Sequence, residues 1–346
     1  MNHMLNEKPN LENDASFYIP ESGLLYIQKT QAVIEYMTQK SCVYEVLSEH
    51  LMVPFEEKDT LFDIIKDMPE TVDLFTSVHP SGSGFSVLSL PLSQLKERIR
   101  YEMLVKVIIS GSLTSYFQPI IRIQDNQIYG YESLLRTRLP NRNIPPGLLF
   151  DVAHKTGLHS LLDLRAREAA LKARAEKLPR GVKSFINFLP ASIYDYKFCL
   201  RHTFTLIEQY DISPEDLVFE VVETEKINDV HFLKKILGIY RDLGVGVALD
   251  DLGSGYATLE TLKILNPNYV KIDRFFISHC DENKVKQRFL QEVMEIAGET
   301  GIYVLAEGIE REEELLYCKS IGMHLAQGYY IGKPAPEPAA IILGGN

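Results

Sequence analysis

The stretch LVFEVVETEKINDVHFLKKILGIYRDLGVGVALDD, residues 217 to 251, has the pattern of a strand, a helix and a second strand. Apolar runs at its two ends have the length typical of buried strands. Between them, residues 229 to 244 space apolar side chains three and four apart and end on glycine, as an amphipathic helix does. Two strands joined by a helical crossover form a parallel pair. The stretch therefore predicts an α/β fold.

The same alternation continues from about residue 116 to the carboxyl end of the chain. The expected strands are residues 115–123, 129–137, 184–190, 217–223, 246–251, 269–274, 303–308 and 326–332. Eight strands with helical crossovers predict a (β/α)8, or TIM, barrel. Only QDNQI joins the first two strands, which is too short for a helix and suits a hairpin. We therefore expect a modified barrel whose first strand is antiparallel.

The residues before position 98 lack this rhythm. Residues 60–68 predict a short helix and residues 81–90 a turn that enters a strand, so we expect a smaller α/β module. Apolar side chains four residues apart predict one connecting helix over 93–110. The expected domains are a regulatory or sensory module of unknown type at 1–97, a barrel at 98–338, and a tail at 339–346.

Composition limits the function. A formal charge of −11 disfavours a nucleic-acid polymer as partner, because polymer binding needs many basic contacts to phosphates. Four widely spaced cysteines fit reduced thiols better than disulfides or a zinc site. The amino terminus is polar, and no apolar run is long enough to cross a bilayer. We expect a cytoplasmic protein without membrane insertion.

Polar residues interrupt the expected strands or follow them directly. They are Glu132, Arg136, Asn187, Glu220, Glu223, Asp250, Asp251, Lys271, Asp273, Glu307 and Gln327. In a TIM barrel the carboxyl ends of the strands meet at one mouth, where active sites lie. Residues far apart in sequence would then share one pocket.

Six of these residues offer only carboxylate or amide oxygens: Glu132, Asn187, Glu220, Asp250, Asp251 and Glu307. An all-oxygen set favours Mg²⁺ or Mn²⁺ over zinc. Five carboxylates exceed what one divalent ion neutralises, so we expect two ions, as in sites that catalyse phosphoryl displacement. Lys271 could steady the attacking water or transition-state charge, Arg136 could hold a phosphate oxygen, and Gln327 could align a ligand or the lysine.

Over residues 98 to 338 the chain resembles the EAL family of cyclic di-GMP phosphodiesterases. The resemblance rests on motifs in order: SYFQPI, YESLLR, INFLP, FEVVETE, ALDDLGSGYATL, VKIDR, LAEGIE and QGYYIGKP. It implies hydrolysis of cyclic di-GMP to linear pGpG by water attack assisted by two Mg²⁺ or Mn²⁺ ions, and a homodimer.

The resemblance also implies roles for individual residues. The six oxygen donors would bind metal, with Asp250 the bridging ligand and Glu132 also counted as catalytic. Lys271 would orient the water, and Glu223 would hold the loop after Asp251. The substrate-binding set would be Arg136, Gln327, Leu134, Gln118, Asp273 and Glu310, of which the last two act from behind the ligands.

The chain departs from the family pattern at four positions without losing a ligand. Ser133 replaces the signature alanine, and Thr137 stands where tryptophan is frequent. Leu252 and Ser254 replace phenylalanine and threonine in the aspartate loop, which the family couples to dimerisation. These changes could alter rate or regulation.

Two alternatives remain open at this point. A non-catalytic cyclic di-GMP receptor would share the fold, but receptors in the family usually lack a metal ligand or the lysine, and this chain has them all. A regulatory protein whose barrel is only a scaffold would bind a partner without needing Glu132.

Overall fold

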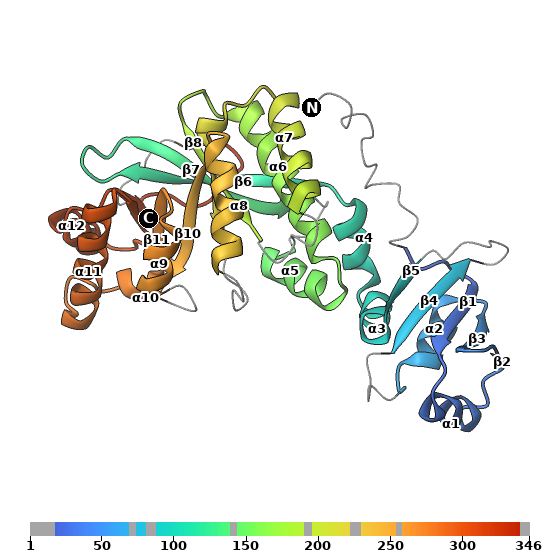
Figure 1. Cartoon of the computed structure of the whole chain (residues 1–346). Coiled ribbons are helices and arrows are strands. Elements are labelled where there is room, and N and C mark those ends of the chain that lie inside the picture. The colour runs from blue at the N-terminus through green and yellow to red at the C-terminus, as the bar shows by residue number, and fades with distance from the viewer. Residues whose placement is uncertain are drawn as a thin grey trace. The chain divides into compact units, whose positions relative to one another are not determined.

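The protein is described by a computed structural model that covers residues 18–68, 74–80, 88–138, 144–189, 196–221, 230–253 and 258–339. The chain divides into two compact units (Figure 1). The first comprises Met1–Ser112 and Asn141–Leu162, and the second comprises Leu113–Pro140 and Asp163–Asn346. Each unit has a hydrophobic core of its own.

The first unit contains an antiparallel sheet of five strands in the order β2-β3-β1-β4-β5. The strands are β1 (Gly23–Gln28), β2 (Glu45–Val46), β3 (His50–Phe55), β4 (Phe75–Pro80) and β5 (Leu88–Pro91). Alternate residues of β1 and β3, such as Leu25 and Leu51, are fully buried, as period-two strands with one covered face require. Helices α1 (Gln31–Gln39), α2 (Lys58–Ile65) and α5 (Pro146–Lys155) belong to the same unit. The α2 helix confirms the short helix expected at 60–68.

The expected single helix over 93–110 is wrong in one respect. The segment forms two helices, α3 (Leu92–Arg100) and α4 (Glu102–Ser110), which meet at Tyr101 with φ −107° and ψ 30°. In α3, Leu92 and Leu95 join the core of the first sheet, whereas α4 buries the consecutive residues 107–109. The two halves bury different faces, and apolar spacing does not reveal such a break because both halves are helical.

The second unit is a closed barrel of eight strands, in the order β6-β7-β8-β9-β10-β11-β12-β13 and back to β6. They are β6 (Leu113–Arg122), β7 (Ile128–Thr137), β8 (Lys183–Phe188), β9 (Leu217–Val221), β10 (Gly246–Leu252), β11 (Tyr269–Ile272), β12 (Tyr303–Ala306) and β13 (Leu325–Gln327). β6 runs antiparallel to both of its neighbours, and the other pairs are parallel. The modified TIM barrel and its antiparallel first strand are confirmed.

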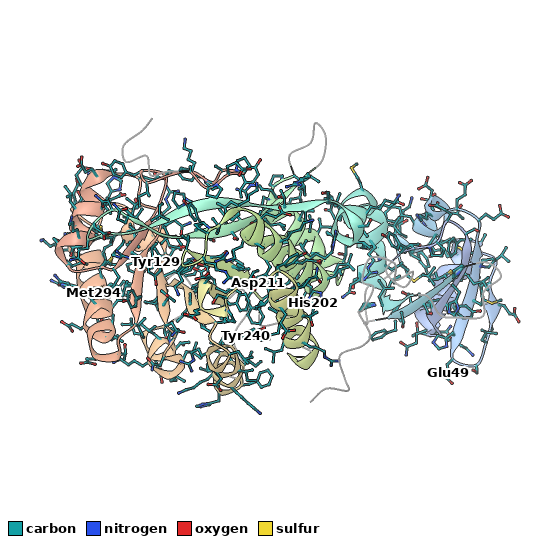
Figure 2. The ribbon with its side chains drawn as sticks, turned by 90° about the horizontal axis from the view of Figure 1, so that it is seen from above. Glu49, Tyr129, His202, Asp211, Tyr240 and Met294 are labelled. Atoms are coloured by element: carbon teal, nitrogen blue, oxygen red, sulfur yellow. The ribbon has the colours of Figure 1, made fainter. Side chains whose placement is uncertain are left out.

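Helices pack on the outside of these strands. They are α6 (His159–Lys177), α7 (Tyr196–Gln209), α8 (Val230–Asp242), α9 (Leu259–Leu265), α10 (Arg274–Ile277), α11 (Lys284–Thr300) and α12 (Glu312–Ser320), with a short 3-10 turn at Pro214–Asp216. Tyr240 of α8, labelled in Figure 2, is fully buried. Its ring packs edge-on against Phe188 and Phe219. Contacts of this kind form the large core between helices and strands, so the barrel interior is left for a second, smaller set of side chains.

No helix in the described ranges is both long and apolar enough to cross a membrane.

Candidate metal-dependent active site

Most barrel strands carry a polar side chain two residues beyond an apolar side chain of the barrel interior. The interior cluster includes Phe185, Val218, Ala248, Tyr269, Leu305 and Leu325. The residues two positions further on are Asn187, Glu220, Asp250, Lys271, Glu307 and Gln327. Side chains two apart on a strand face the same way, so a polar layer lies on the apolar one at the carboxyl ends of the strands. β6 runs the other way, and there Gln118 precedes the interior residue Ile120.

Lys271 is the centre of the polar layer. Its side chain is almost fully buried, and Nζ lies 2.8 Å from Glu220 Oε1 and 2.8 Å from Glu307 Oε1. Asp250 Oδ1 is 3.2 Å away and Glu132 Oε1 3.8 Å away. Four carboxylates from four strands therefore converge on one ammonium group.

Glu132 is hydrogen-bonded to residues of two other strands in the polar layer, Gln327 of β13 and Asn187 of β8. Its Oε2 accepts a hydrogen bond of 2.6 Å from Gln327 Nε2, and its Oε1 accepts one of 3.4 Å from Asn187 Nδ2. The parallel pairing of β7 with β8 sets Glu132 beside Phe185, so Asn187 reaches it diagonally. Gln327 is buried, and its own Oε1 accepts no hydrogen bond from the described residues. That oxygen is available to a ligand.

Asp251 owes its place to a local irregularity of β10. The pairing of β10 with β11 shifts register between Leu249 and Leu252, and Asp251 has φ +54°, in the left-handed region. Aspartate tolerates that conformation better than most residues. In a regular strand, Asp250 and Asp251 would point to opposite faces. Here oxygens of Asp250, Asp251 and Glu307 all lie within 4.8 Å of one another.

Burial and mutual repulsion shift the pKa values of this layer. Burial raises the pKa of Glu307 to about 8, and burial followed by the Asp250 charge raises that of Asp251 to about 6. Burial also raises the pKa of Glu220 well above its ordinary value, although Lys271 opposes the shift. For Lys271, burial acts to lower the pKa, but the surrounding carboxylates outweigh it and hold the pKa well above the usual range. The lysine stays protonated at neutral pH.

The donor set fits divalent cations. Four carboxyl groups surround one ammonium group and a fifth, that of Asp251, lies beside them, which is more acidic groups than Lys271 alone can balance. Both Glu220 oxygens are buried; Oε1 has Lys271 Nζ beside it at 2.8 Å, and Oε2 accepts no hydrogen bond within the described part of the chain. An all-oxygen cluster of this kind suits Mg²⁺, Mn²⁺ or Ca²⁺ rather than zinc. We conclude that the mouth of the barrel can hold metal.

The expected substrate-binding residues of the first hairpin lie on β6 and β7, the two strands that also carry Glu132 and its partner. Arg136 lies on β7, with its guanidinium carbon 5.1 Å from the ring centre of Tyr116. Leu134 is paired with Tyr116 across the hairpin, and Gln118 is paired with Glu132. The Gln118 amide donates to the carbonyl of Gly332, so this side chain also ties the segment after β13 to the barrel.

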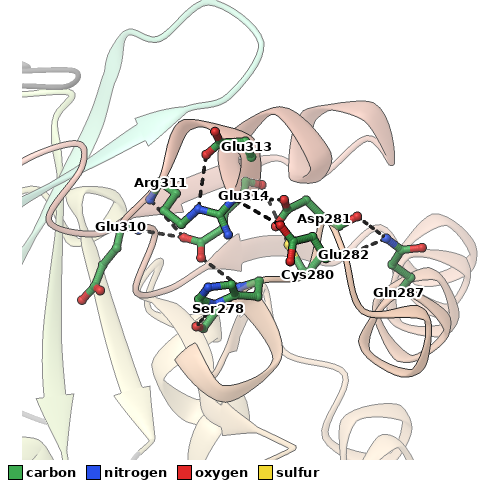
Figure 3. A network of polar contacts seen from close by, with 10 residues as sticks. Ser278, Cys280, Asp281, Glu282, Gln287, Glu310, Arg311, Glu313 and Glu314 are labelled. Atoms are coloured by element: carbon green, nitrogen blue, oxygen red, sulfur yellow. Dashed lines mark hydrogen bonds and ion pairs between the residues drawn. The ribbon is translucent and has the colours of Figure 1, made fainter.

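Asp273 and Glu310 make other contacts. Asp273 Oδ1 accepts a 2.8 Å hydrogen bond from Phe275 N and caps α10. Glu310 is exposed and forms an ion pair of 2.9 Å with Arg274. The backbone N–H of Glu310 donates to buried Glu314, within the network drawn in Figure 3. Glu223 lies outside the described residues, so its predicted role stays a prediction.

Three of the four departures from the family pattern can be located. Thr137 is the last residue of β7 and pairs with Leu113 of β6. Ser133 points away from the Glu132 side of β7, and its hydroxyl contacts that of buried Ser184 at 3.2 Å. Leu252 is fully buried in the outer core. Ser254 lies outside the described residues. The substitutions at Ser133 and Leu252 therefore lie in packing contacts outside the polar layer.

Sequence reasoning missed Tyr116, whose ring lies under Arg136. The signal was available in the hairpin register, since antiparallel pairing across QDNQI brings residues 114 to 116 beside 134 to 136. It also missed the backbone turn at Asp251, for which adjacent aspartates before a glycine give only a weak indication.

Comparisons with known proteins agree with this geometry. Residues 101–334 match the EAL domain family. The chain is 34% identical over 244 residues to the probable cyclic di-GMP phosphodiesterase PdeG of Escherichia coli K12, an alignment that covers 67% of this chain and 46% of PdeG. It is 33% identical over 223 residues to the cyclic di-GMP phosphodiesterase PdeF of the same organism, covering 63% of this chain and 29% of PdeF. The chain thus spans less than half the length of these curated relatives.

A solved structure gives the same result. The standalone EAL protein of Vibrio cholerae O395, in its c-di-GMP-bound form, superposes with a TM-score of 0.61 and 32% identity. The match covers 67% of this chain and 96% of that one. The matched residues span the whole barrel with its polar layer, and this chain belongs to the EAL domain family.

Proposed function

We propose that this protein is a cyclic di-GMP phosphodiesterase that hydrolyses one phosphodiester bond of cyclic di-GMP to give linear pGpG. The main observation that supports this proposal is the cluster of four carboxylates around Lys271 at the barrel mouth, from Glu132, Glu220, Asp250 and Glu307. Membership of the EAL family and the phosphodiesterase relatives support the choice of substrate.

The proposed site holds two Mg²⁺ or Mn²⁺ ions on the six oxygen donors from Glu132 to Glu307. Bound divalent ions lower the pKa of a coordinated water and offset the charge of the scissile phosphate. Asp250 and Asp251 are adjacent on β10, and their carboxylates would both hold metal beside Glu307. Asn187 adds a neutral oxygen, and its hydrogen bond to Glu132 sets the orientation of that carboxylate.

The chain's own residues have distinct tasks in this reaction. Lys271 is protonated, so it serves as a hydrogen-bond donor to the attacking water and to charge that develops on the phosphate, and it does not serve as the base. Arg136 binds a phosphate oxygen, and Gln327 holds Glu132 through its amide group and offers its free oxygen to substrate. Leu134 and Gln118 form the substrate-facing wall of the first hairpin. Asp273, Glu310 and Glu223 support the loops around the site.

The rest of the chain completes the proposal. None of the proposed ligands lies in residues 1–97, and we assign that module a regulatory role. Residues 98–338 are the catalytic barrel and 339–346 a tail. A cytoplasmic location and a homodimer follow from the expected reduced thiols and from the family resemblance. A monomer at micromolar concentration in analytical ultracentrifugation would contradict the dimer.

The test is product analysis by chromatography after incubation of the full chain with cyclic di-GMP, with Mg²⁺ or Mn²⁺ and with chelator. We expect pGpG only with metal, and loss of product in Glu132→Ala. The matched control is Glu292→Gln, which changes an exposed carboxylate on α11 and should keep full activity. Binding of cyclic di-GMP without any product would instead support the non-catalytic receptor.

A further inference from the structure

A buried ion pair on helix α6 contacts the end of β8, the strand that carries Asn187. Asp163 and Arg167 are one helical turn apart on α6, 3% and 1% exposed, and they form an ion pair with each other. Asp163 Oδ1 also accepts a 3.2 Å hydrogen bond from Leu189 N. Burying two charges is costly unless both make further contacts, so a pair in this place needs an explanation.

Arg167 supplies those further contacts. Its Nη1 donates to Thr203 Oγ1 of α7 at 2.9 Å, and its guanidinium carbon lies 4.7 Å from the ring centre of Phe188. Phe188 and Leu189 are the two residues that follow Asn187. The pair therefore contacts both residues that follow Asn187. Arg167 lies over the ring of Phe188, and Asp163 accepts a hydrogen bond from the backbone N–H of Leu189.

We propose that Asp163 and Arg167 are positioning residues that fix Asn187 in the ligand layer. The inference rests on the proposed function, because Asn187 is a metal ligand only there. Asn187 contacts Glu132 at 3.4 Å, so a small shift of the end of β8 would move two ligands together. In this proposal neither member of the pair is a metal ligand: Asp163 acts through the backbone N–H of Leu189, and Arg167 acts through the ring of Phe188.

The chain offers a matched control on the same helix. Arg174 and Asp216 form a second buried ion pair, with Arg174 Nη2 2.5 Å from Asp216 Oδ2. Arg174 donates to the carbonyl of Leu178, and Asp216 accepts from Gly181 N. These contacts lie on the amino side of β8, at the opposite end of the strand from Asn187. The two pairs share their chemistry and burial and differ in which end of β8 they hold.

The experiment measures Mn²⁺ binding to the full chain by electron paramagnetic resonance of free Mn²⁺. Asp163→Asn keeps an oxygen for Leu189 N but removes the charge that Arg167 needs. Loss of an outer group that orients a metal ligand typically weakens metal binding about 10- to 100-fold, and we expect a loss of about tenfold in Asp163→Asn. Asp216→Asn should bind Mn²⁺ like the wild type while losing comparable thermal stability.

The outcomes are separable. Equal Mn²⁺ affinity in Asp163→Asn and the wild type would overturn the proposal, as would an equal loss in both variants. If circular dichroism finds Asp163→Asn unfolded, Arg167→Lys decides the question. It keeps the charge but cannot contact Thr203 and Phe188 together, and it should also weaken Mn²⁺ binding. A wild-type chain that binds Mn²⁺ but releases no pGpG contradicts the phosphodiesterase and leaves this comparison intact.

Discussion

Asp251 is the site residue whose position depends most on its own backbone. At φ +54° it lies where a residue with an ordinary side chain is strained, and this conformation directs its carboxylate toward Asp250 and Glu307. Charge and conformation can be separated by two substitutions, because asparagine tolerates the left-handed region and alanine does not.

We predict that Asp251→Asn and Asp251→Ala both weaken Mn²⁺ binding, while only the alanine variant loses stability. Without metal, Asp251→Asn should be at least as stable as the wild type, because it removes one of several clustered carboxylates. Alanine adds a conformational cost of about 1–2 kcal/mol in the left-handed region. Urea unfolding with chelator measures the difference, and equal midpoints for the two variants would refute the argument.

At the scale of elements, α12 is joined to the preceding loop through one buried carboxylate. Glu314 is 1% exposed, and it accepts hydrogen bonds from the backbone N–H groups of His279, Glu310 and Arg311 (Figure 3). The helix therefore begins in a fixed relation to the segment that follows Glu307. Arg311 adds a partly exposed ion pair of 3.2 Å with Asp281.

Glu314→Ala should lower the free energy of unfolding by about 2–4 kcal/mol, since it removes three hydrogen bonds from backbone N–H groups to a buried carboxylate. Its neighbour Glu313 is the control, because that side chain is 60% exposed and pairs only at the surface with Arg311. Glu313→Ala should cost less than about 1 kcal/mol. Denaturant unfolding of the two variants tests this, and similar losses would show that the Glu314 contacts contribute little.

His324 makes the end of the barrel sensitive to acid. Its Nδ1 accepts a 3.0 Å hydrogen bond from Val304 N of β12, which requires the neutral ring, and burial lowers its pKa below the ordinary value. The unfolded chain then takes up this proton first. Neutral His324 therefore contributes its full share to the free energy of unfolding above the unfolded-state pKa of about 6.5. That share is lost as the pH falls from there through the lower folded-state pKa.

We therefore expect the unfolding midpoint to fall between pH 6.5 and 5.5 by more in the wild type than in His324→Asn. Asparagine can accept the same hydrogen bond but does not titrate. Urea titrations at both pH values measure the difference. A wild-type chain and a variant with the same pH dependence would exclude His324 as the cause.

At the scale of the whole molecule, the two units have separate hydrophobic cores, although the first is assembled from two stretches of chain. Leu51 of β3 is fully buried among the residues of the first core, next to β1 and β2 in the sheet. The stability of that sheet should therefore depend on apolar contacts of its own.

Leu51→Ala should destabilise the first unit by about 2–5 kcal/mol, because it removes a buried side chain and leaves a cavity. Hydrogen exchange should become faster for the backbone amides of β1, β3 and β4. Val43→Ala is the control, since Val43 is 77% exposed and should change nothing measurable. Unchanged exchange in Leu51→Ala would mean that this core does not hold the sheet.

The sequence by itself determined the barrel, the antiparallel first strand and the residues of the polar layer. Apolar runs of strand length report burial on both faces, and the short QDNQI link permits only a hairpin, so local patterns carry this information. The sequence also shows that strand after strand has a polar residue two positions beyond an apolar one. These polar residues point to a shared site because the carboxyl ends of the strands meet in a TIM barrel.

Only the tertiary structure decided which charges touch. Four carboxylates surround Lys271 because barrel closure brings β7, β9, β10 and β12 around β11, and no local pattern gives those distances. The hydrogen bond between Asp163 and Leu189 has the same origin, since it joins residues 26 positions apart on different elements. The break at Tyr101 and the left-handed turn at Asp251 are backbone conformations that apolar spacing does not report.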